Sequence, residues 1–146
     1  MKMGETAVST NADALTATGI GSCVVITLYD PKSKVGALSH TMLPSHSQGS
    51  LHQARDTKYI EVAIEEMLRK MLALGAKQQD IEAKLIGAAN MFPEFESDIG
   101  KQNVLSAKDK LKKEGIRLVG DCVGGSIGRS VDLDIASGLV TVKMKF

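Results

Sequence analysis

The chain has 146 residues, 43% of them hydrophobic and 24% charged, and a formal net charge of +1. This length lets one domain bury about two-thirds of its unfolded surface, and the small charge argues against nucleic-acid or anionic-membrane partners. Because no stretch resembles a signal peptide or the roughly 20 apolar residues of a membrane span, we expect one cytoplasmic domain over 1–146 without membrane insertion.

The first half of the chain is expected to be mainly strands. Residues 4–10 and 14–18 are predicted as short strands separated by a polar turn. A hairpin follows, because the run 24–29 is rich in β-branched residues and a second strand-like run covers 34–43. Asp30-Pro31 ends the first strand of this hairpin, since both residues favour a turn.

The second half alternates helices and strands. Apolar residues recur at helical spacing in 55–74, which predicts an amphipathic helix capped by Gly75. The later elements are expected as a strand over 82–89, a helix over 99–114 that is capped by Gly115, a strand over 116–123 and a closing hairpin over 130–146. This order predicts an α/β fold: a single layered domain whose mixed β-sheet has N-terminal β-hairpins and two main helices packed on it.

Cys23 is the first candidate for chemistry, because it follows the turn 19–22 and begins the apolar strand. If 30–33 is a four-residue type I turn, facing residues have numbers that add to 63, which pairs Cys23 directly with His40. A slip of one residue would put the two side chains on opposite faces. A Cys/His pair is typical of a nucleophile with its base, whereas a buried, inert cysteine is the alternative.

Other candidate sites are weaker. Because we expect a cytoplasmic chain, Cys23 and Cys122 are expected as free thiols. The glycine-rich loop 124–129 precedes a strand, not the helix that a phosphate cradle needs. His46 and His52, taken with Cys23 and His40, match no compact metal-ligand pattern. We expect neither a metal nor a cofactor.

Several ordered motifs resemble the CheD family of chemoreceptor glutamine deamidases. They begin with Gly-Ile-Gly-Ser-Cys-Val at 19–24 and the run from Val35 to Pro44, which includes His40. Others follow nearly to the end of the chain: Gly75-Ala76, Gly87-Ala88-Ala89-Asn90-Met91-Phe92, Ile99-Gly100, Asn103, Glu114-Gly115-Ile116, Asp121, Gly124-Gly125 and Gly128-Arg129.

The resemblance implies roles for individual residues. Cys23 would be the nucleophile, His40 the general base, and a threonine just before the cysteine would orient the imidazole. One common family form has that threonine six residues before the cysteine, where this chain has Ala17. A shorter form matches Thr18, which we take as the candidate, while Thr16 or a backbone carbonyl remains open.

The implied reaction is hydrolysis of a glutamine side-chain amide to glutamate and ammonia through a thioester, without a cofactor. The implied substrates are glutamines of methyl-accepting chemotaxis receptors, and a CheC-type phosphatase is an implied regulatory partner. Two alternatives stay open. The chain could be a catalytically weak adaptor that binds receptors or a CheC-type protein, or it could be a Cys/His hydrolase of small amides.

Overall fold

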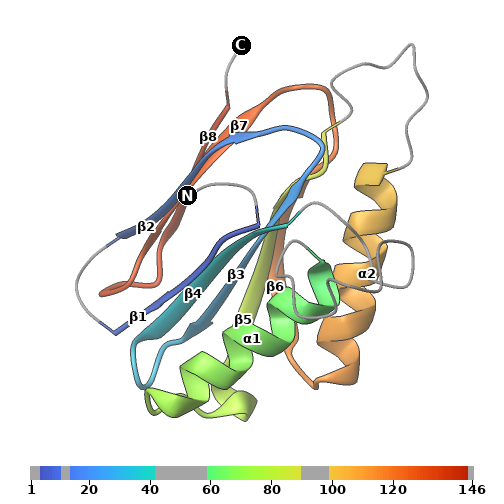
Figure 1. Cartoon of the computed structure of the whole chain (residues 1–146). Coiled ribbons are helices and arrows are strands. Elements are labelled where there is room, and N and C mark those ends of the chain that lie inside the picture. The colour runs from blue at the N-terminus through green and yellow to red at the C-terminus, as the bar shows by residue number, and fades with distance from the viewer. Residues whose placement is uncertain (1–3, 11–13, 42–58, 90–98, 145–146) are drawn as a thin grey trace.

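A computed structural model describes residues 4–10, 14–41, 59–89 and 99–144. Two sheets are built from its strands (Figure 1). The order in the five-stranded sheet is β1-β4-β3-β5-β6, and in the three-stranded sheet it is β2-β7-β8. The strands are β1 (Thr6–Ser9), β2 (Ala14–Ile20), β3 (Val24–Asp30), β4 (Val35–Thr41), β5 (Glu82–Gly87), β6 (Arg117–Val123), β7 (Arg129–Asp134) and β8 (Val140–Met144).

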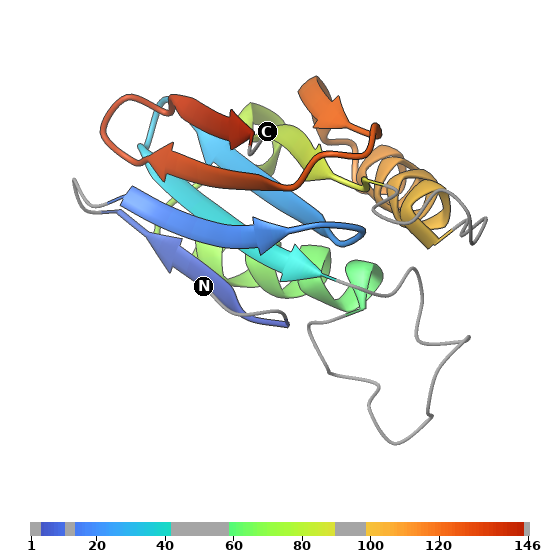
Figure 2. The same cartoon turned by 90° about the horizontal axis from the view of Figure 1, so that it is seen from above.

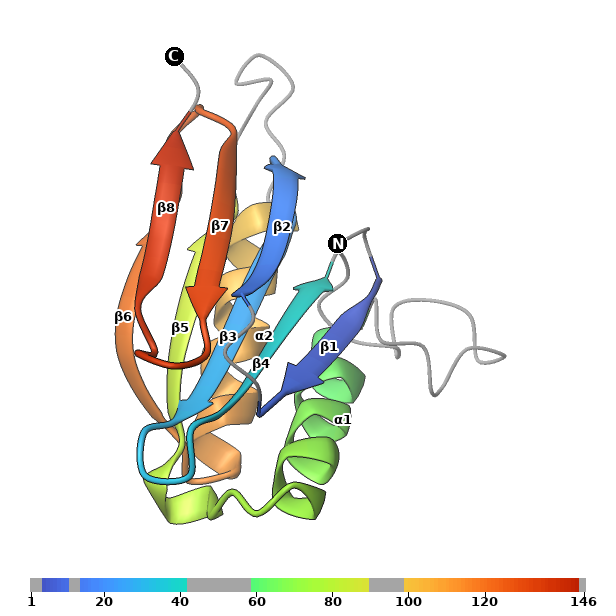
Figure 3. The ribbon, with the colours of Figure 1, turned by 90° about the vertical axis from the view of Figure 1, so that its left-hand side faces the viewer.

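The helices cover one face of the five-stranded sheet and the three-stranded sheet covers the other (Figures 1 and 3). They are α1 (Ile60–Ala73) and α2 (Ile99–Lys113), with a short 3-10 helix at Gln78–Asp80. Every residue of β3 and β4 is buried because these strands are covered on both faces. The predicted mixed sheet with two packed helices is confirmed.

Alternate residues of β3 face different layers. Val24, Ile26 and Leu28 pack with the helices, whereas Val25 and Tyr29 pack against the three-stranded sheet. This period of two is the usual property of a strand, and here it divides the core into two apolar layers. No helix in the described part of the chain is long and apolar enough to cross a membrane.

The N-terminal strands differ from the expectation. β1 pairs with β4, and β2 pairs with β7, so these two strands enter different sheets and form no hairpin with each other. The β3–β4 and β7–β8 hairpins are confirmed. The β5–β6 pair is parallel, which makes the larger sheet mixed.

Both helices end just before the glycines that were predicted as their C-terminal caps. Gly75 and Gly115 have φ of 103° and 71°, in the left-handed region that glycine enters without a steric cost. The amides of Ala76 and Ile116 then donate back to the last turn of α1 and α2, respectively. Leu74, expected in the buried stripe of α1, lies beyond the last helical residue and is 48% exposed.

Candidate active site

Cys23 lies where the chain crosses from one sheet to the other. Gly21, Ser22 and Cys23 connect the end of β2 to the start of β3 (Figure 2). Ser22 is exposed, whereas Cys23 is 8% exposed. The turn therefore leaves the backbone near the surface and the thiol nearly buried.

Hydrogen bonds hold all three carbonyls of this turn. The Ala89 amide donates to the Gly21 oxygen at 3.0 Å, and the Ala88 amide donates to the Cys23 oxygen at 2.8 Å. The Asn103 Nδ2 of α2 lies 3.5 Å from the Ser22 oxygen, a long hydrogen bond. The turn is thus fixed to the end of β5 and to the buried face of α2.

The end of β5 can approach the turn only because Gly87 has no side chain. A Cβ there would lie 2.3 Å from the Cys23 carbonyl oxygen and 2.7 Å from Ile20 Cγ2. Gly87 also has a φ of 115°, and the next residue, Ala88, is left-handed at 55°. Such a conformation is uncommon for a residue with a side chain. The backbone that supports Cys23 is therefore strained and closely packed.

Arg129 joins the ends of two strands beside this backbone. It is 5% exposed. Its Nη1 donates to the Gly87 oxygen at 3.1 Å and its Nη2 to the Gly124 oxygen at 2.7 Å, while the Gly124 amide donates to the same Gly87 oxygen at 2.9 Å. The glycine-rich loop thus binds the Arg129 guanidinium group through the Gly124 carbonyl. The sequence shows Arg129 only as part of a family motif and does not reveal this contact.

His40 lies on β4 and is 3% exposed. It pairs with Val25, so facing residues of the hairpin have numbers that add to 65 and the predicted direct pairing with Cys23 is wrong. Four residues, 31–34, form the loop, in which Lys34 is left-handed at 56° and donates to the Asp30 oxygen. The loop is two residues longer than expected.

A register change of two residues keeps the same face of the sheet, because the side-chain period of a strand is two. Leu38, which shares its face of β4 with His40, packs between the two sheets. His40 therefore points to the layer in which Val25 lies. A residue two positions before Val25 is a diagonal neighbour of His40, at a typical Cα separation of about 7–8 Å. The Cys23–His40 pairing as a catalytic pair stays a prediction.

The environment of Cys23 affects its ionisation. Burial raises the pKa of the Cys23 thiol, because removing water penalises the thiolate. Burial thus favours the thiol over the thiolate, so the attack on a substrate needs a base that takes the thiol proton. Cys122, on β6, is half-buried, and both cysteines are free as expected.

The threonines near Cys23 have different surroundings. Thr16 is exposed and its hydroxyl donates to Asp132 Oδ1 at 2.7 Å across the outer surface of the small sheet. Ala17 is fully buried between the sheets. Thr18 is exposed. The inward position six residues before the cysteine thus has no hydroxyl group, and an orienting role for Thr18 stays a prediction.

The metal site considered from the sequence would combine His40, His46 and His52 with Cys23. His46 and His52 lie outside the described residues. Within the described ranges, no group of three or more His, Cys, Asp or Glu side chains is placed to hold a metal ion.

Comparisons with known proteins agree on one family. The model of the CheD family, described as "CheD chemotactic sensory transduction", matches residues 42–144. A Pyrococcus abyssi protein named "Probable chemoreceptor glutamine deamidase CheD" is 42% identical over 144 residues, which cover 97% of this chain and 88% of the relative. A Thermotoga maritima protein named "Chemoreceptor glutamine deamidase CheD" is 38% identical over 141 residues, with the same two coverages.

A Thermococcus kodakarensis protein with the same name as the Pyrococcus abyssi relative is 39% identical over 144 residues, covering 97% of this chain and 89% of the relative. The family model begins after His40, but these alignments extend over nearly the whole chain and so include the β3–β4 hairpin. By both the family model and the full-length relatives, this chain belongs to the CheD family.

Proposed function

We propose that this chain is a cytoplasmic chemoreceptor glutamine deamidase, which hydrolyses glutamine side chains of methyl-accepting chemotaxis receptors to glutamate and ammonia. One observation carries the proposal: in a chain of this family, a nearly buried cysteine and a buried histidine lie at the same end of one hairpin. The shared names of the relatives support the substrate class.

The reaction would begin with a proton transfer from Cys23 to His40 as the sulfur attacks the carboxamide carbon of the substrate. A C–S bond forms and the carbonyl becomes an oxyanion. The imidazolium of His40 then protonates the departing amine, the C–N bond breaks, and ammonia leaves a thioester on Cys23. Water, deprotonated by His40, hydrolyses the thioester to glutamate and restores the thiol.

The hydrogen bonds of the turn support a place for the oxyanion. In a planar trans peptide the C=O and the following N–H point in opposite directions. The Gly21 and Ser22 carbonyls point to Ala89 and Asn103, so the N–H groups of Ser22 and Cys23 point away from β5 and α2. Amides held in this way need no rearrangement to stabilise negative charge beside the sulfur.

The test uses the purified full-length chain with the cytoplasmic fragment of a chemoreceptor. Peptide mass spectrometry reads the conversion of each glutamine, and released ammonia is measured in parallel. We expect conversion at defined receptor glutamines and little turnover of free glutamine.

Two other results would contradict the proposal. Binding of the receptor, or of a CheC-type phosphatase as regulatory partner, without any conversion would favour the adaptor alternative. Free glutamine turned over as fast as the receptor would favour a small-amide hydrolase.

A further inference from the structure

Arg129 is a buried cation whose partners in the described ranges are backbone carbonyls and not carboxylates. It is 5% exposed, and its terminal nitrogens donate to the oxygens of Gly87 and Gly124. Burial of a charge without an opposite charge is costly. At the other end of β3, Tyr29 ties the same two sheets together with an uncharged hydroxyl group. A tie between the sheets therefore does not by itself account for a buried guanidinium.

Arg129 reaches the end of β5 from the layer between the two sheets. It begins β7 and pairs with Ile20, the last residue of β2. Paired residues of an antiparallel sheet have side chains on the same face, and Ile20 packs between the sheets. The guanidinium therefore crosses from the small sheet to β5 within the layer that His40 also faces.

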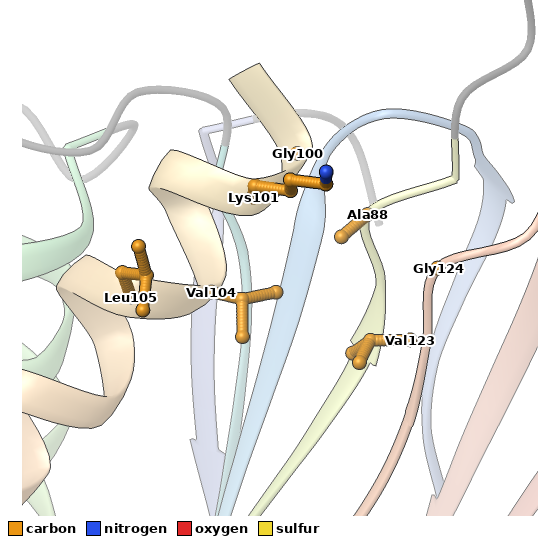
Figure 4. Close-up of a pocket in the computed structure, with 7 residues that line it drawn as sticks. All are labelled: Ala88, Gly100, Lys101, Val104, Leu105, Val123 and Gly124. Atoms are coloured by element: carbon orange, nitrogen blue, oxygen red, sulfur yellow. The ribbon is translucent and has the colours of Figure 1, made fainter. Parts of the chain in front are cut away.

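One peptide plane links Arg129 to the Cys23 turn. The Gly87 carbonyl and the Ala88 amide belong to the same planar unit and point in opposite directions. The Gly87 oxygen accepts from Arg129 Nη1 at 3.1 Å and from the Gly124 amide at 2.9 Å. On the other edge of the plane, the Ala88 amide donates to the Cys23 oxygen at 2.8 Å. Figure 4 shows Ala88 and Gly124 at the neighbouring ends of β5 and β6. The donors that fix one edge of the plane thus also orient its bond to Cys23.

This plane is held in an orientation that its own residues do not favour. Gly87 and Ala88, on either side of it, have φ of 115° and 55°. A left-handed alanine is disfavoured, because its Cβ lies close to the following carbonyl oxygen. Rotation of the plane changes φ of Ala88, so it would release Ala88 from the left-handed region and turn its amide away from Cys23. A donor that holds the Gly87 oxygen opposes this rotation.

The backbone of Arg129 acts on the other side of the Cys23 turn. It pairs with Ile20, which lies three residues before Cys23. Ile20 also packs closely on the end of β5, where a Cβ on Gly87 would lie 2.7 Å from Ile20 Cγ2. Arg129 therefore contacts the segment that enters the turn and the peptide that supports the carbonyl at its end.

We propose that Arg129 is a positioning residue for the nucleophile. It holds the peptide between Gly87 and Ala88 so that the sulfur of Cys23 keeps its place relative to His40 during attack. This inference rests on the proposed function. The guanidinium acts through the backbone and not through contact with the substrate. Its planar fork bridges two carbonyl oxygens at once, which the ammonium group of a lysine does not reproduce.

The test measures kcat and KM separately on the cytoplasmic receptor fragment, with the full-length chain well below its melting temperature. Arg129→Met removes every donor at similar side-chain length. We expect kcat to fall about 10²-fold and KM to stay within about twofold, because a misplaced nucleophile slows the reaction without weakening binding. Arg129→Lys keeps the charge but not the fork, so its kcat should fall only roughly tenfold.

The matched control is Tyr29→Phe, which removes the hydrogen bond between the same two sheets at the other end of β3. It should lower the melting temperature and leave kcat unchanged. Both Arg129 variants should also keep the wild-type pH midpoints of kcat, because the effect passes through the backbone and not through the charge.

A double variant tests whether Arg129 and Gly87 act on the same peptide. Arg129→Met combined with Gly87→Ala should be hardly slower than Gly87→Ala alone, because residues that act as a unit are not additive. Losses that multiply in the double variant would mean that the two residues act independently, and the inference would be wrong.

The outcomes separate the two proposals. If the wild-type protein converts no receptor glutamine, the proposed function fails and this inference fails with it. If the wild type is active, a wild-type kcat in Arg129→Met overturns the inference alone. Should that variant not fold, a wild-type kcat in Arg129→Lys overturns it. Equal losses of kcat in Tyr29→Phe, or a shifted pH midpoint that accounts for the lost rate, would also contradict a positioning role.

Discussion

The two ends of β3 bury polar groups for different purposes. At the C-terminal end, Asp30 is 1% exposed and accepts hydrogen bonds from the backbone amides of Lys32, Ser33 and Lys77. The adjacent Tyr29 donates its hydroxyl to the Ile135 carbonyl at 2.7 Å, which ties the two sheets together. This end is a structural joint.

The N-terminal end of β3 shows the opposite character. Here the Cys23 turn rests on a closely packed glycine and on Ala88 in a left-handed conformation. A thiol with a raised pKa and a guanidinium group are buried nearby. Strain and buried ionisable groups often mark functional sites, because they are retained despite their cost. Changes at this end should therefore reduce activity, and changes at the other end should reduce stability.

After removal of the Cys23 sulfur itself, the largest effect is expected for His40→Gln. Loss of the general base should lower kcat by about 10²–10⁴-fold, since base catalysis contributes that much. Folding should be retained because glutamine is close in size to histidine and remains polar. Deamidation kinetics and a thermal melt check this together. A variant with wild-type kcat would exclude His40 as the base.

A smaller loss is expected for Gly87→Ala, whose Cβ would collide with the Cys23 carbonyl oxygen. Displacement of a nucleophile by about 1 Å can cost about 10²-fold in rate. The matched control is Gly75→Ala, which has a similar φ of 103° but no atom within 4 Å of the added Cβ. The control should lose about 1–2 kcal/mol of stability and no activity. Equal activity losses would contradict a specific role of the turn.

Asp30→Asn tests the structural end. Burial alone would raise the pKa of Asp30, but the hydrogen bonds from Lys77, Ser33 and Lys32 outweigh it and hold the pKa below its usual range. A lowered folded pKa stabilises the fold above the unfolded value of about 3.9, and this stabilisation is lost as pH falls through the folded pKa.

The asparagine variant should therefore lose about 1–3 kcal/mol at neutral pH, and the difference from wild type should shrink in acid. Denaturant unfolding at both pH values measures it. Deamidase activity of the folded variant should be unchanged. A selective loss of activity, with normal stability, would contradict the division between the two ends of β3.

The smallest effect is expected for Thr18→Ala, because an orienting residue acts only through His40. We expect kcat to fall by no more than roughly tenfold, or about 1.4 kcal/mol of transition-state stabilisation. Thr16→Ala is the control, since that hydroxyl is bonded to Asp132. If Thr16→Ala lowers kcat as much as Thr18→Ala, the orienting role does not belong to Thr18.

Local patterns in the sequence were enough to predict the two helices, their glycine caps and most strands. The register of the β3–β4 hairpin was not predictable, because Lys34 adopts a left-handed conformation that its residue type does not signal. The second sheet depends on pairing of β2 with β7, more than a hundred residues later, and no local pattern reports such a partner. The face of the sheet predicted for His40 was still correct, because the register differs from the predicted one by two residues and the side-chain period of a strand is also two.

The sequence revealed less about the support of the site. Arg129 and Gly87 belonged to the family motifs, but their contact depends on strands that meet only in the fold. The sequence pattern predicts a solvated face for Lys108, Lys110, Lys112 and Lys113. In the structure Lys110 bridges to α1, while the other three lysines are exposed. Residue spacing shows which side chains share one face of a helix, but it does not show which face is covered by a neighbouring helix or strand.

The central claim is that the sulfur of Cys23 carries the reaction. The most direct measurement compares Cys23→Ala with Cys122→Ala, the other free cysteine, in the conversion of receptor glutamines followed by mass spectrometry. Cys23→Ala should convert no glutamine and lose only about 1 kcal/mol of stability, whereas Cys122→Ala should keep nearly the wild-type rate. A Cys23→Ala protein that deamidates the receptor at a near wild-type rate would contradict the account.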